Sequence, residues 1–146
     1  MGELANKKDI LLAEDDREDV EIFDLAMREL SFPYIIRHAE NGDVLFVLLK
    51  DKTPYILFLD IDMPCKDGMA CIVEIRKNRA YDQMPVIMYT SHMAAKIIEE
   101  SYRNGANLYL TKTNTFRGLT EKLKKVFAID WTDYLHYPPH DQFVLS

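Results

Sequence analysis

The sequence predicts an α/β fold in which helices wrap both faces of a parallel sheet of five strands. Short apolar runs alternate five times with segments whose apolar residues recur every three or four positions, which is the spacing of one helix face. The central run, residues 55–59, is apolar throughout and lies between Pro54 and Pro64, as expected for a strand buried on both faces of a parallel sheet. The short connections favour right-handed crossovers between strands.

The first half of the chain supplies two strand–helix pairs. Residues 9–13 form an apolar run that stops at an acidic triplet, and Asp16 is in position to cap the helix that follows. Residues 34–39 are expected to form an edge strand, because Arg37 and His38 interrupt its apolar character; His38 is expected at the surface rather than as a ligand. An Asn-Gly-Asp turn then precedes the second helix. The apolar positions that mark the two helices are Val20, Phe23, Met27 and Leu30, and then Val44, Val47 and Leu48.

The second half repeats the pattern three times around the remaining strands. A helix is expected after the turn at residues 66–68, and it ends in basic residues. Residues 84–89 and 107–111 are expected to be strands, and residues 94–104 and 115–128 are expected to be the helices after them. The apolar positions that mark the three helices are Met69, Ile72, Val73 and Ile75, then Ile97 and Ile98, then Phe116, Leu119, Leu123 and Val126.

The length of 146 residues predicts one domain with a full hydrophobic core. We place that domain at residues 1–128. Residues 129–146 are too few for a second domain, but they contain more aromatic residues than expected of a tail that lies entirely in solvent. Two alternatives stay open for this tail, which either packs on the domain or binds a partner. Its aromatic and proline residues are Trp131, Tyr134, Tyr137, Pro138, Pro139 and Phe143.

The composition excludes several classes of protein. A net charge of −6 argues against a general nucleic-acid surface, which would need clustered lysine and arginine. No apolar stretch reaches the roughly eighteen residues of a membrane span, and the amino-terminal residues lack a signal sequence. Cys65 and Cys71 match no zinc spacing and suggest no disulfide framework. We therefore expect free thiols and a cytoplasmic protein.

Polar side chains follow the expected strands and should meet at one edge of the sheet, because parallel strands share their carboxyl ends. The residues at these ends are Glu14, Asp15, Asp60, Thr90 and Lys112. Neighbouring carboxylates repel one another unless a cation lies among them, and an all-oxygen site suits Mg²⁺. A lysine and a hydroxyl beside such an ion could hold a phosphoryl group, and an aspartate could accept it. As single residues, Thr90 and Asp62 could equally be strand-end groups that bond backbone or solvent.

These motifs, in this order, resemble the receiver domain of two-component response regulators over about residues 8–128. The matching segments are residues 10–16 (ILLAEDD), 59–64 (LDIDMP), 67–68 (DG), 85–91 (PVIMYTS), 105–106 (GA) and 109–112 (YLTK). The resemblance implies a flavodoxin-like (βα)5 fold with strand order 2-1-3-4-5. It also implies a signalling protein rather than a conventional enzyme. Because no effector domain follows in this sequence, we expect a stand-alone receiver.

The resemblance assigns a role to each strand-end residue. Asp60 would accept a phosphoryl group from a histidine kinase or a phosphotransfer protein, in a Mg²⁺-dependent self-phosphorylation that autodephosphorylation reverses. Asp15 would bind Mg²⁺ directly, Glu14 would act directly or through water, and the main-chain carbonyl of Asp62 would add a further ligand. Thr90 would hydrogen-bond the phosphoryl oxygens together with the lysine at the end of the fifth strand.

The resemblance also implies a switch. Tyr109 occupies the position of the switch aromatic, and Thr90 would move toward the phosphoryl group so that Tyr109 turns inward. An aromatic residue in a half-buried strand is more often simple packing. The surface of the fourth helix, fifth strand and fifth helix would then change and bind a downstream protein or a second copy of the chain.

The sequence departs from the family pattern in three ways; one is the lack of a following effector domain, given above, and the other two lie near the site. Thr113 follows Lys112 where the family usually has proline. Either the peptide bond between them is cis, although a non-proline cis bond costs about 3–4 kcal/mol, or the loop runs trans and Lys112 approaches the site differently. We favour the cis bond, because Lys112 must still reach the phosphoryl group. Asp62 and His92 lie two residues beyond Asp60 and the strand-end threonine. Both are expected either to set the lifetime of the phosphorylated state or to be plain surface residues.

Two alternatives to a working receiver remain. An Asp-x-Asp motif after an apolar strand also resembles the haloacid-dehalogenase-type phosphatases, in which Asp60 would be the nucleophile and Asp62 a general acid. Two observations argue against it: Met63 and Pro64 stand where that family has a threonine region, and the chain leaves no room for a cap domain. The other alternative is a receiver-like binding module that is never phosphorylated, because the presence of the residues does not prove their use.

Overall fold

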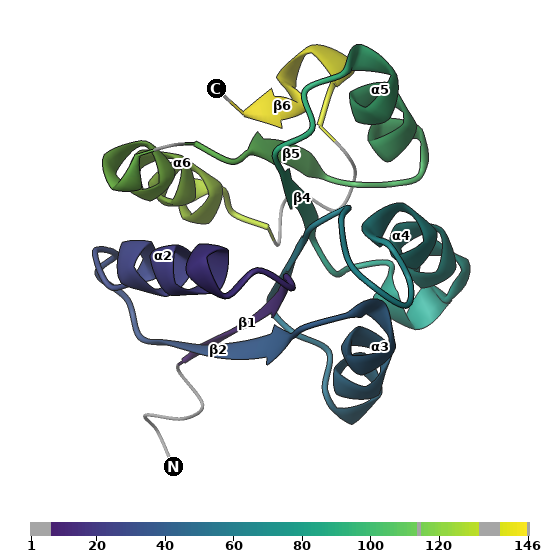
Figure 1. Ribbon diagram of the computed structural model, residues 1–146, viewed down its shortest axis with the longest axis horizontal. Helices are drawn as coiled ribbons and strands as arrows, with labels where there is room; N and C mark the ends of the chain where they lie inside the picture. The colour runs from purple at the N-terminus through teal and green to yellow at the C-terminus, as the bar shows by residue number, and fades with distance from the viewer. Residues whose placement is uncertain (1–6, 114, 132–137, 146) are drawn as a thin grey trace.

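The computed structural model describes residues 7–113, 115–131 and 138–145, and within them it forms a parallel sheet of six strands in the order β2-β1-β3-β4-β5-β6 (Figure 1). Each strand is parallel to its neighbours, and the register of β1 against β3 pairs Ile10 with Ile56 and Ala13 with Leu59. The strands are β1 (Lys8–Ala13), β2 (Tyr34–Ala39), β3 (Ile56–Leu59), β4 (Val86–Thr90), β5 (Leu108–Thr111) and β6 (Val144–Leu145).

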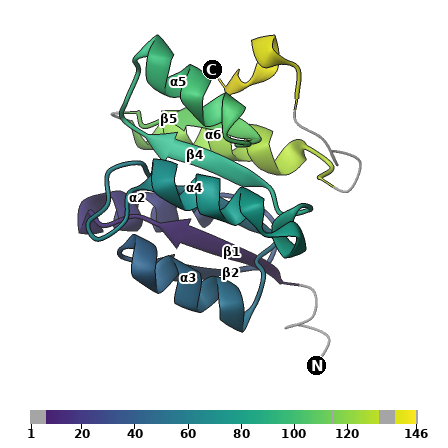
Figure 2. The same cartoon turned by 90° about the vertical axis from the view of Figure 1, so that its right-hand side faces the viewer.

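Helices cover both faces of this sheet, which confirms the doubly wound α/β prediction. They are α2 (Arg17–Met27), α3 (Gly42–Asp51), α4 (Gly68–Lys77), α5 (Ala95–Arg103) and α6 (Phe116–Ala128), with short 3₁₀ turns η1 (Arg79–Tyr81) and η2 (His140–Gln142). The pair α2 and α6 lies on one face, and α3, α4 and α5 lie on the other (Figure 1). Figure 2 shows the latter three stacked side by side in front of the strands.

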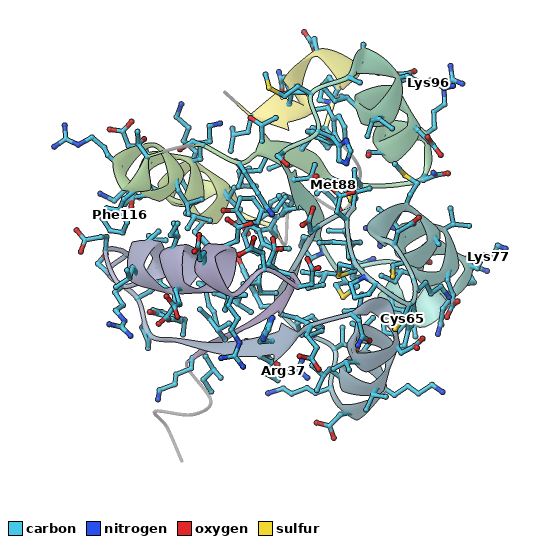
Figure 3. The ribbon with its side chains drawn as sticks, in the orientation of Figure 1. Arg37, Cys65, Lys77, Met88, Lys96 and Phe116 are labelled. Carbon is cyan, nitrogen blue, oxygen red and sulfur yellow. The ribbon has the colours of Figure 1, made fainter. Side chains whose placement is uncertain are left out.

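Each face of the sheet has its own hydrophobic core, because successive residues of a strand point to opposite sides. Leu11, Leu57 and Met88 face the layer of α3, α4 and α5. Leu12 and Phe58 face the layer of α2 and α6. Strands β3 and β4 are buried at every position, as the uninterrupted apolar run around residues 55–59 predicted. Figure 3 shows Met88 in the interior of the molecule.

A side-chain cap starts every described α-helix except α5. The side chain of Asp16 accepts hydrogen bonds from the backbone N–H groups of Glu18 and Asp19, which confirms the expected cap of α2. Asn41 caps α3 in the same way. Phe116 differs from the prediction: it is 44% exposed, at the periphery of the molecule (Figure 3), because as the first residue of α6 it precedes the buried stripe that begins at Leu119. None of the helices that the structure describes is both long and apolar enough to cross a bilayer.

The predicted edge strand β2 lies at one end of the sheet, where Arg37 has a structural use that the sequence did not reveal. Its guanidinium donates a hydrogen bond to Asp9 on β1 at 2.9 Å and further bonds to the backbone carbonyls of Leu48 and Lys52. Arg37 therefore ties β2 to the end of α3, and its charge is paired rather than directed at a ligand.

The carboxyl-terminal segment corrects the prediction of five strands. Its described part, residues 138–145, packs on the domain and adds β6 to the outer edge of β5. Phe143 is 1% exposed, and Trp131 is 5% exposed and donates its indole N–H to the Val126 carbonyl at 3.2 Å. Tyr134 and Tyr137 lie outside the described residues. A strand of two residues carries no period in the sequence, which is why it was missed.

Candidate functional site

Backbone hydrogen bonds hold the strand-end residues at one edge of the sheet. The N–H of Asp60 donates to the Ala13 carbonyl at 3.0 Å, so that Asp60 continues β3 alongside β1. In the same way the N–H of Lys112 donates to the carbonyl of Thr90 at 2.8 Å, which continues β5 alongside β4. Asp60 and Lys112, which are 52 positions apart in the sequence, thus become neighbours because the sheet is parallel.

Three carboxylates form a compact acidic cluster at this edge. Glu14, Asp15 and Asp60 each have a carboxylate oxygen within 4.8 Å of the others. Glu14 and Asp60 are buried, and Asp15 is exposed. Burial raises the pKa of Glu14 to about 8, and the charge of Asp60 adds to this shift while Lys112 opposes it. An unshielded cluster of this kind is electrostatically costly.

Lys112 lies in the middle of this acidic edge. Its Nζ is 2.6 Å from Glu14 Oε1, 2.7 Å from Asp19 Oδ2 and 3.0 Å from Asp60 Oδ2. Burial by itself would lower the pKa of Lys112, but the hydrogen bond to Asp19 and the close negative charges of Glu14 and Asp60 outweigh it and raise the pKa. Lys112 is therefore a fixed ammonium group beside the Asp60 carboxylate.

The acidic cluster fits a divalent cation such as Mg²⁺. The donor set is all oxygen, and the buried Glu14 Oε1 makes an ion pair with Lys112 but has no partner in hydrogen-bonding geometry among the described residues. The Asp62 N–H lies 3.3 Å from Asp60 Oδ1 as a hydrogen-bond donor, which keeps the loop after β3 beside the cluster. The role of the Asp62 main-chain carbonyl as a metal ligand stays a prediction.

Thr90 and Tyr109 both hydrogen-bond the backbone of His92, in the loop that joins β4 to α5. Thr90 is fully buried, and its hydroxyl accepts a hydrogen bond from the His92 N–H at 3.4 Å. Tyr109 is also fully buried, and its hydroxyl donates to the His92 carbonyl at 2.8 Å. Burial raises the pKa of Tyr109 to about 12, and the charges of Asp60 and Asp62 add to the shift. Both side chains therefore hydrogen-bond the backbone of the same residue, His92.

The two residues at the rim of the site contact each other. His92 Nε2 lies 2.9 Å from both carboxylate oxygens of Asp62. The side chain of Asp62 is 65% exposed and that of His92 is 39% exposed. An exposed pair of this kind contributes little to folding stability. Its backbone N–H groups bond Asp60 and Thr90, so the pair lies directly beside the site.

The structure brings in residues that the sequence analysis missed. Asp19 on α2 hydrogen-bonds Lys112, and the ring of Tyr89 lies 5.5 Å from the same ammonium. Helical spacing could have indicated Asp19, because it precedes the buried Phe23 by one turn and shares its face. His38 is exposed, as expected, and its Nε2 lies 2.6 Å from the Glu14 carbonyl oxygen, which it helps to position.

The expected cis bond between Lys112 and Thr113 is wrong. The described chain contains no cis peptide bond, and Lys112 reaches Asp60 at 3.0 Å with a trans connection. The cis bond was favoured because Lys112 must reach the phosphoryl group on Asp60. Lysine has a flexible four-carbon side chain, so its ammonium reaches Asp60 from a trans backbone. The cost of a non-proline cis bond is thereby avoided.

Comparisons with known proteins identify the family of the chain. Residues 10–124 match the family model described as the response regulator receiver domain. The transcriptional regulatory protein KdpE of Staphylococcus aureus is 31% identical over 120 residues, which cover 82% of this chain and 50% of KdpE. The chain thus spans half the length of that relative, whereas it spans 93% of the response regulator Rcp1 of Synechocystis, to which it is 23% identical over 138 residues.

Solved structures show the same fold. The Mn²⁺-bound form of Rcp1 superimposes with a TM-score of 0.76 at 23% identity, over 90% of this chain and 99% of Rcp1. The phosphorylated cyanobacterial phytochrome response regulator RcpA gives a TM-score of 0.77 at 24% identity, over 82% of this chain and 91% of RcpA. The family match confirms the expected receiver domain and disfavours the phosphatase alternative. The chain belongs to the response regulator receiver domain family.

Proposed function

We propose that this protein is phosphorylated on Asp60 by a histidine kinase or a phosphotransfer protein, and that Mg²⁺ binds at Glu14, Asp15 and Asp60. One observation carries the proposal: the Lys112 ammonium lies 3.0 Å from the same Asp60 carboxylate that belongs to the acidic cluster. A nucleophile, a fixed cation and a ligand set for a second cation therefore share one edge of the sheet. Positioning and charge neutralisation are most of what phosphoryl transfer requires of a protein.

The reaction balances with the groups present. An Asp60 carboxylate oxygen forms the new bond to phosphorus while the bond from phosphorus to the donor imidazole nitrogen breaks, and the electron pair stays on that nitrogen. A bound Mg²⁺ would neutralise charge on the carboxylates and on the phosphoryl oxygens. Lys112 neutralises a further oxygen, and the Thr90 hydroxyl, now bonded by the His92 N–H, is the candidate donor to a third.

The rim pair is proposed to set the lifetime of the phosphorylated state. His92 holds the Asp62 carboxylate at the mouth of the site, 2.9 Å from its Nε2. A negative group in that place either orients or repels a water molecule that approaches the acyl phosphate. Because Asp62 and His92 form one unit, substitution of either should change the rate of autodephosphorylation in the same direction.

The output surface includes the carboxyl-terminal segment. The helix–strand–helix surface expected from the sequence corresponds to α5, β5 and α6, and β6 lies on it along β5 (Figure 1). Tyr109 links this surface to the site, because its hydroxyl bonds His92 and its ring packs on Phe143. Movement of Thr90 toward a phosphoryl group would disturb His92 and, through Tyr109, the docking of residues 138–145. A downstream protein or a second copy of the chain would detect that change.

The test is beryllofluoride binding together with phosphorylation by acetyl phosphate. The wild-type protein should bind beryllofluoride only with Mg²⁺ and should gain the mass of one phosphoryl group with acetyl phosphate. Asp60→Asn should abolish both, whereas Asp62→Asn should retain both, because its side chain is outside the acidic cluster.

Two other outcomes would contradict the proposal. A wild-type protein that ignores beryllofluoride would be a receiver-like module that is not phosphorylated. Sustained turnover of a simple phosphomonoester, lost in both Asp60→Asn and Asp62→Asn, would identify a phosphatase in which the second aspartate is a general acid.

A further inference from the structure

We propose that Asp19 is a positioning residue for phosphoryl transfer, which holds the Lys112 ammonium in the site while Asp60 accepts the phosphoryl group. The inference rests on the function proposed above and adds a residue to it. Asp19 lies on α2, 93 residues before Lys112 in the sequence, and does not belong to the acidic cluster that fits a cation.

The contacts of Lys112 single out Asp19 from the other two carboxylates. Lys112 Nζ donates hydrogen bonds to Asp19 Oδ2 at 2.7 Å and to Asp60 Oδ2 at 3.0 Å, and its 2.6 Å contact with Glu14 Oε1 is an ion pair outside hydrogen-bonding geometry. The side chain of Lys112 is 14% exposed and that of Asp19 is 30% exposed, so the pair is only partly screened by solvent. An ammonium has three donors, and Asp19 takes one of them without taking part in the cluster.

Asp19 is the one of these three partners whose charge the reaction leaves unchanged. Phosphorylation converts the Asp60 carboxylate into an acyl phosphate, which removes its carboxylate charge. A cation at the cluster would share the charge of Glu14 as well as that of Asp60. Lys112 must turn from Asp60 toward the phosphoryl oxygens, and the bond to Asp19 keeps its ammonium near the site during that change.

The position of Asp19 is rigid, as a positioning residue requires. Asp19 lies in the first turn of α2, and its N–H donates to the capping side chain of Asp16 at 3.3 Å. One turn later Phe23 is fully buried, with its ring centroid 5.8 Å from that of Tyr89. The Lys112 ammonium lies 5.5 Å from the Tyr89 ring centroid. A packed helix therefore carries the carboxylate, and an aromatic ring bounds the lysine.

Two rival explanations of the same contact predict different results. If Asp19 only ties α2 to the loop after β5, its removal should lower folding stability and leave the rate of phosphorylation unchanged. If Asp19 acts only through its charge, its removal should speed the reaction, because a negative group beside the site repels an anionic phosphoryl donor. Positioning predicts a slower reaction at unchanged Mg²⁺ affinity.

The experiment compares Asp19→Asn with Glu18→Gln in the full chain. Asparagine keeps the shape and the oxygen of Asp19 but removes its charge. Glu18 is the matched control, because it is also an acid in the first turn of α2, is exposed, and is not among the groups that contact Lys112. Three quantities are measured: the phosphorylation rate with acetyl phosphate at saturating Mg²⁺, the Mg²⁺ dissociation constant, and the mobility of the Lys112 ammonium by NMR without metal or phosphoryl donor.

For Asp19→Asn we expect phosphorylation to slow by about 10- to 100-fold, as is typical when a group that orients a functional side chain is lost. The Mg²⁺ dissociation constant should stay within about twofold of wild type, and the Lys112 ammonium should become more mobile. Glu18→Gln should match the wild type in all three measurements.

An unchanged or faster phosphorylation rate in Asp19→Asn would overturn the proposal, and so would a loss of rate that weaker Mg²⁺ binding fully explains. An unchanged Lys112 mobility would also overturn it. Failure of the proposed function is distinguishable, because then the wild type itself would not be phosphorylated while the ammonium measurement would still report whether Asp19 restrains Lys112.

Discussion

The backbone N–H of Tyr109 donates a hydrogen bond to the carbonyl of Phe143 at 2.9 Å, and the ring centroids of the two residues lie 6.0 Å apart. The carboxyl-terminal segment thus packs directly on Tyr109, whose hydroxyl hydrogen-bonds the His92 carbonyl beside the site. Tyr102 on α5 completes this contact, with its ring 5.1 Å from that of Phe143 and its hydroxyl 3.3 Å from the Pro138 carbonyl. Residues 138–145 are therefore part of the folded domain and are joined to the site by one side chain.

Removal of the Phe143 ring should destabilise the fold. Phe143→Ala deletes a side chain that is 1% exposed, and the loss of a buried phenylalanine typically costs about 3–5 kcal/mol of unfolding free energy. Urea denaturation measures the change. Val144→Ala is the matched control on the same strand; because Val144 is 42% exposed, it should cost less than about 1 kcal/mol. Equal stabilities for the two variants would mean that the segment is not docked in solution.

Activation should loosen the pairing of β6 with β5. With beryllofluoride and Mg²⁺, we expect the Tyr109 amide, which bonds the Phe143 carbonyl, to exchange its hydrogen for deuterium faster than in the free protein. The Asn107 amide is an internal control, because it bonds the Val86 carbonyl on the other side of β5 and should stay unchanged. If the Tyr109 amide exchanges as slowly with beryllofluoride as without it, the carboxyl-terminal segment does not take part in the switch.

Mg²⁺ binding should strengthen as pH rises toward 8. Burial raises the pKa of Glu14 to about 8, so without metal a fraction of this carboxyl group still holds a proton near neutral pH and must lose it to bind a cation. Because the folded state holds this proton more tightly than the unfolded chain, metal-free stability should fall as pH rises from the ordinary carboxyl range toward 8. Isothermal titration calorimetry in buffers of different ionisation enthalpy should detect the released proton.

The Glu14→Gln variant checks the source of this pH dependence. It cannot release a proton from position 14, so its weaker Mg²⁺ binding should vary little between about pH 6 and about pH 8. If Mg²⁺ binding by Glu14→Gln keeps the full pH dependence of the wild type, the released proton comes from a group other than Glu14.

Gly68 should tolerate no side chain. A Cβ at this position would lie 2.1 Å from the Asp60 carbonyl oxygen and 2.8 Å from the Ile61 Cα, both of which are backbone atoms. Gly68→Ala must therefore displace the loop that carries Asp60, at a cost of about 1–3 kcal/mol in unfolding free energy. Beryllofluoride affinity should fall in addition, because Asp60 moves relative to Lys112.

Ala70→Gly is the matched control for this substitution. Ala70 is exposed in the same helical turn, so its change to glycine should weaken α4 by about 1 kcal/mol and leave beryllofluoride affinity unchanged. If Gly68→Ala binds beryllofluoride as tightly as Ala70→Gly, the close approach of Gly68 does not position Asp60.

The sequence by itself determined five of the six strands, the five α-helices and the edge of the sheet at which the functional groups lie. Those features follow from local patterns: the apolar run at residues 55–59 specifies a buried strand, and Asp16 specifies the start of a helix. The parallel topology then brings Asp60 and Lys112 to one edge.

Only the tertiary structure decided that Asp19 holds Lys112, that the Lys112–Thr113 bond is trans and that residues 144–145 pair with β5. Each of these depends on the packing of segments far apart in the chain. An acidic residue in the first turn of a helix is as readily explained by the helix dipole, and a strand of two residues has no pattern of its own. Periodicity records which face of an element is buried, whereas the partner that a side chain meets on that face is set by how the elements pack.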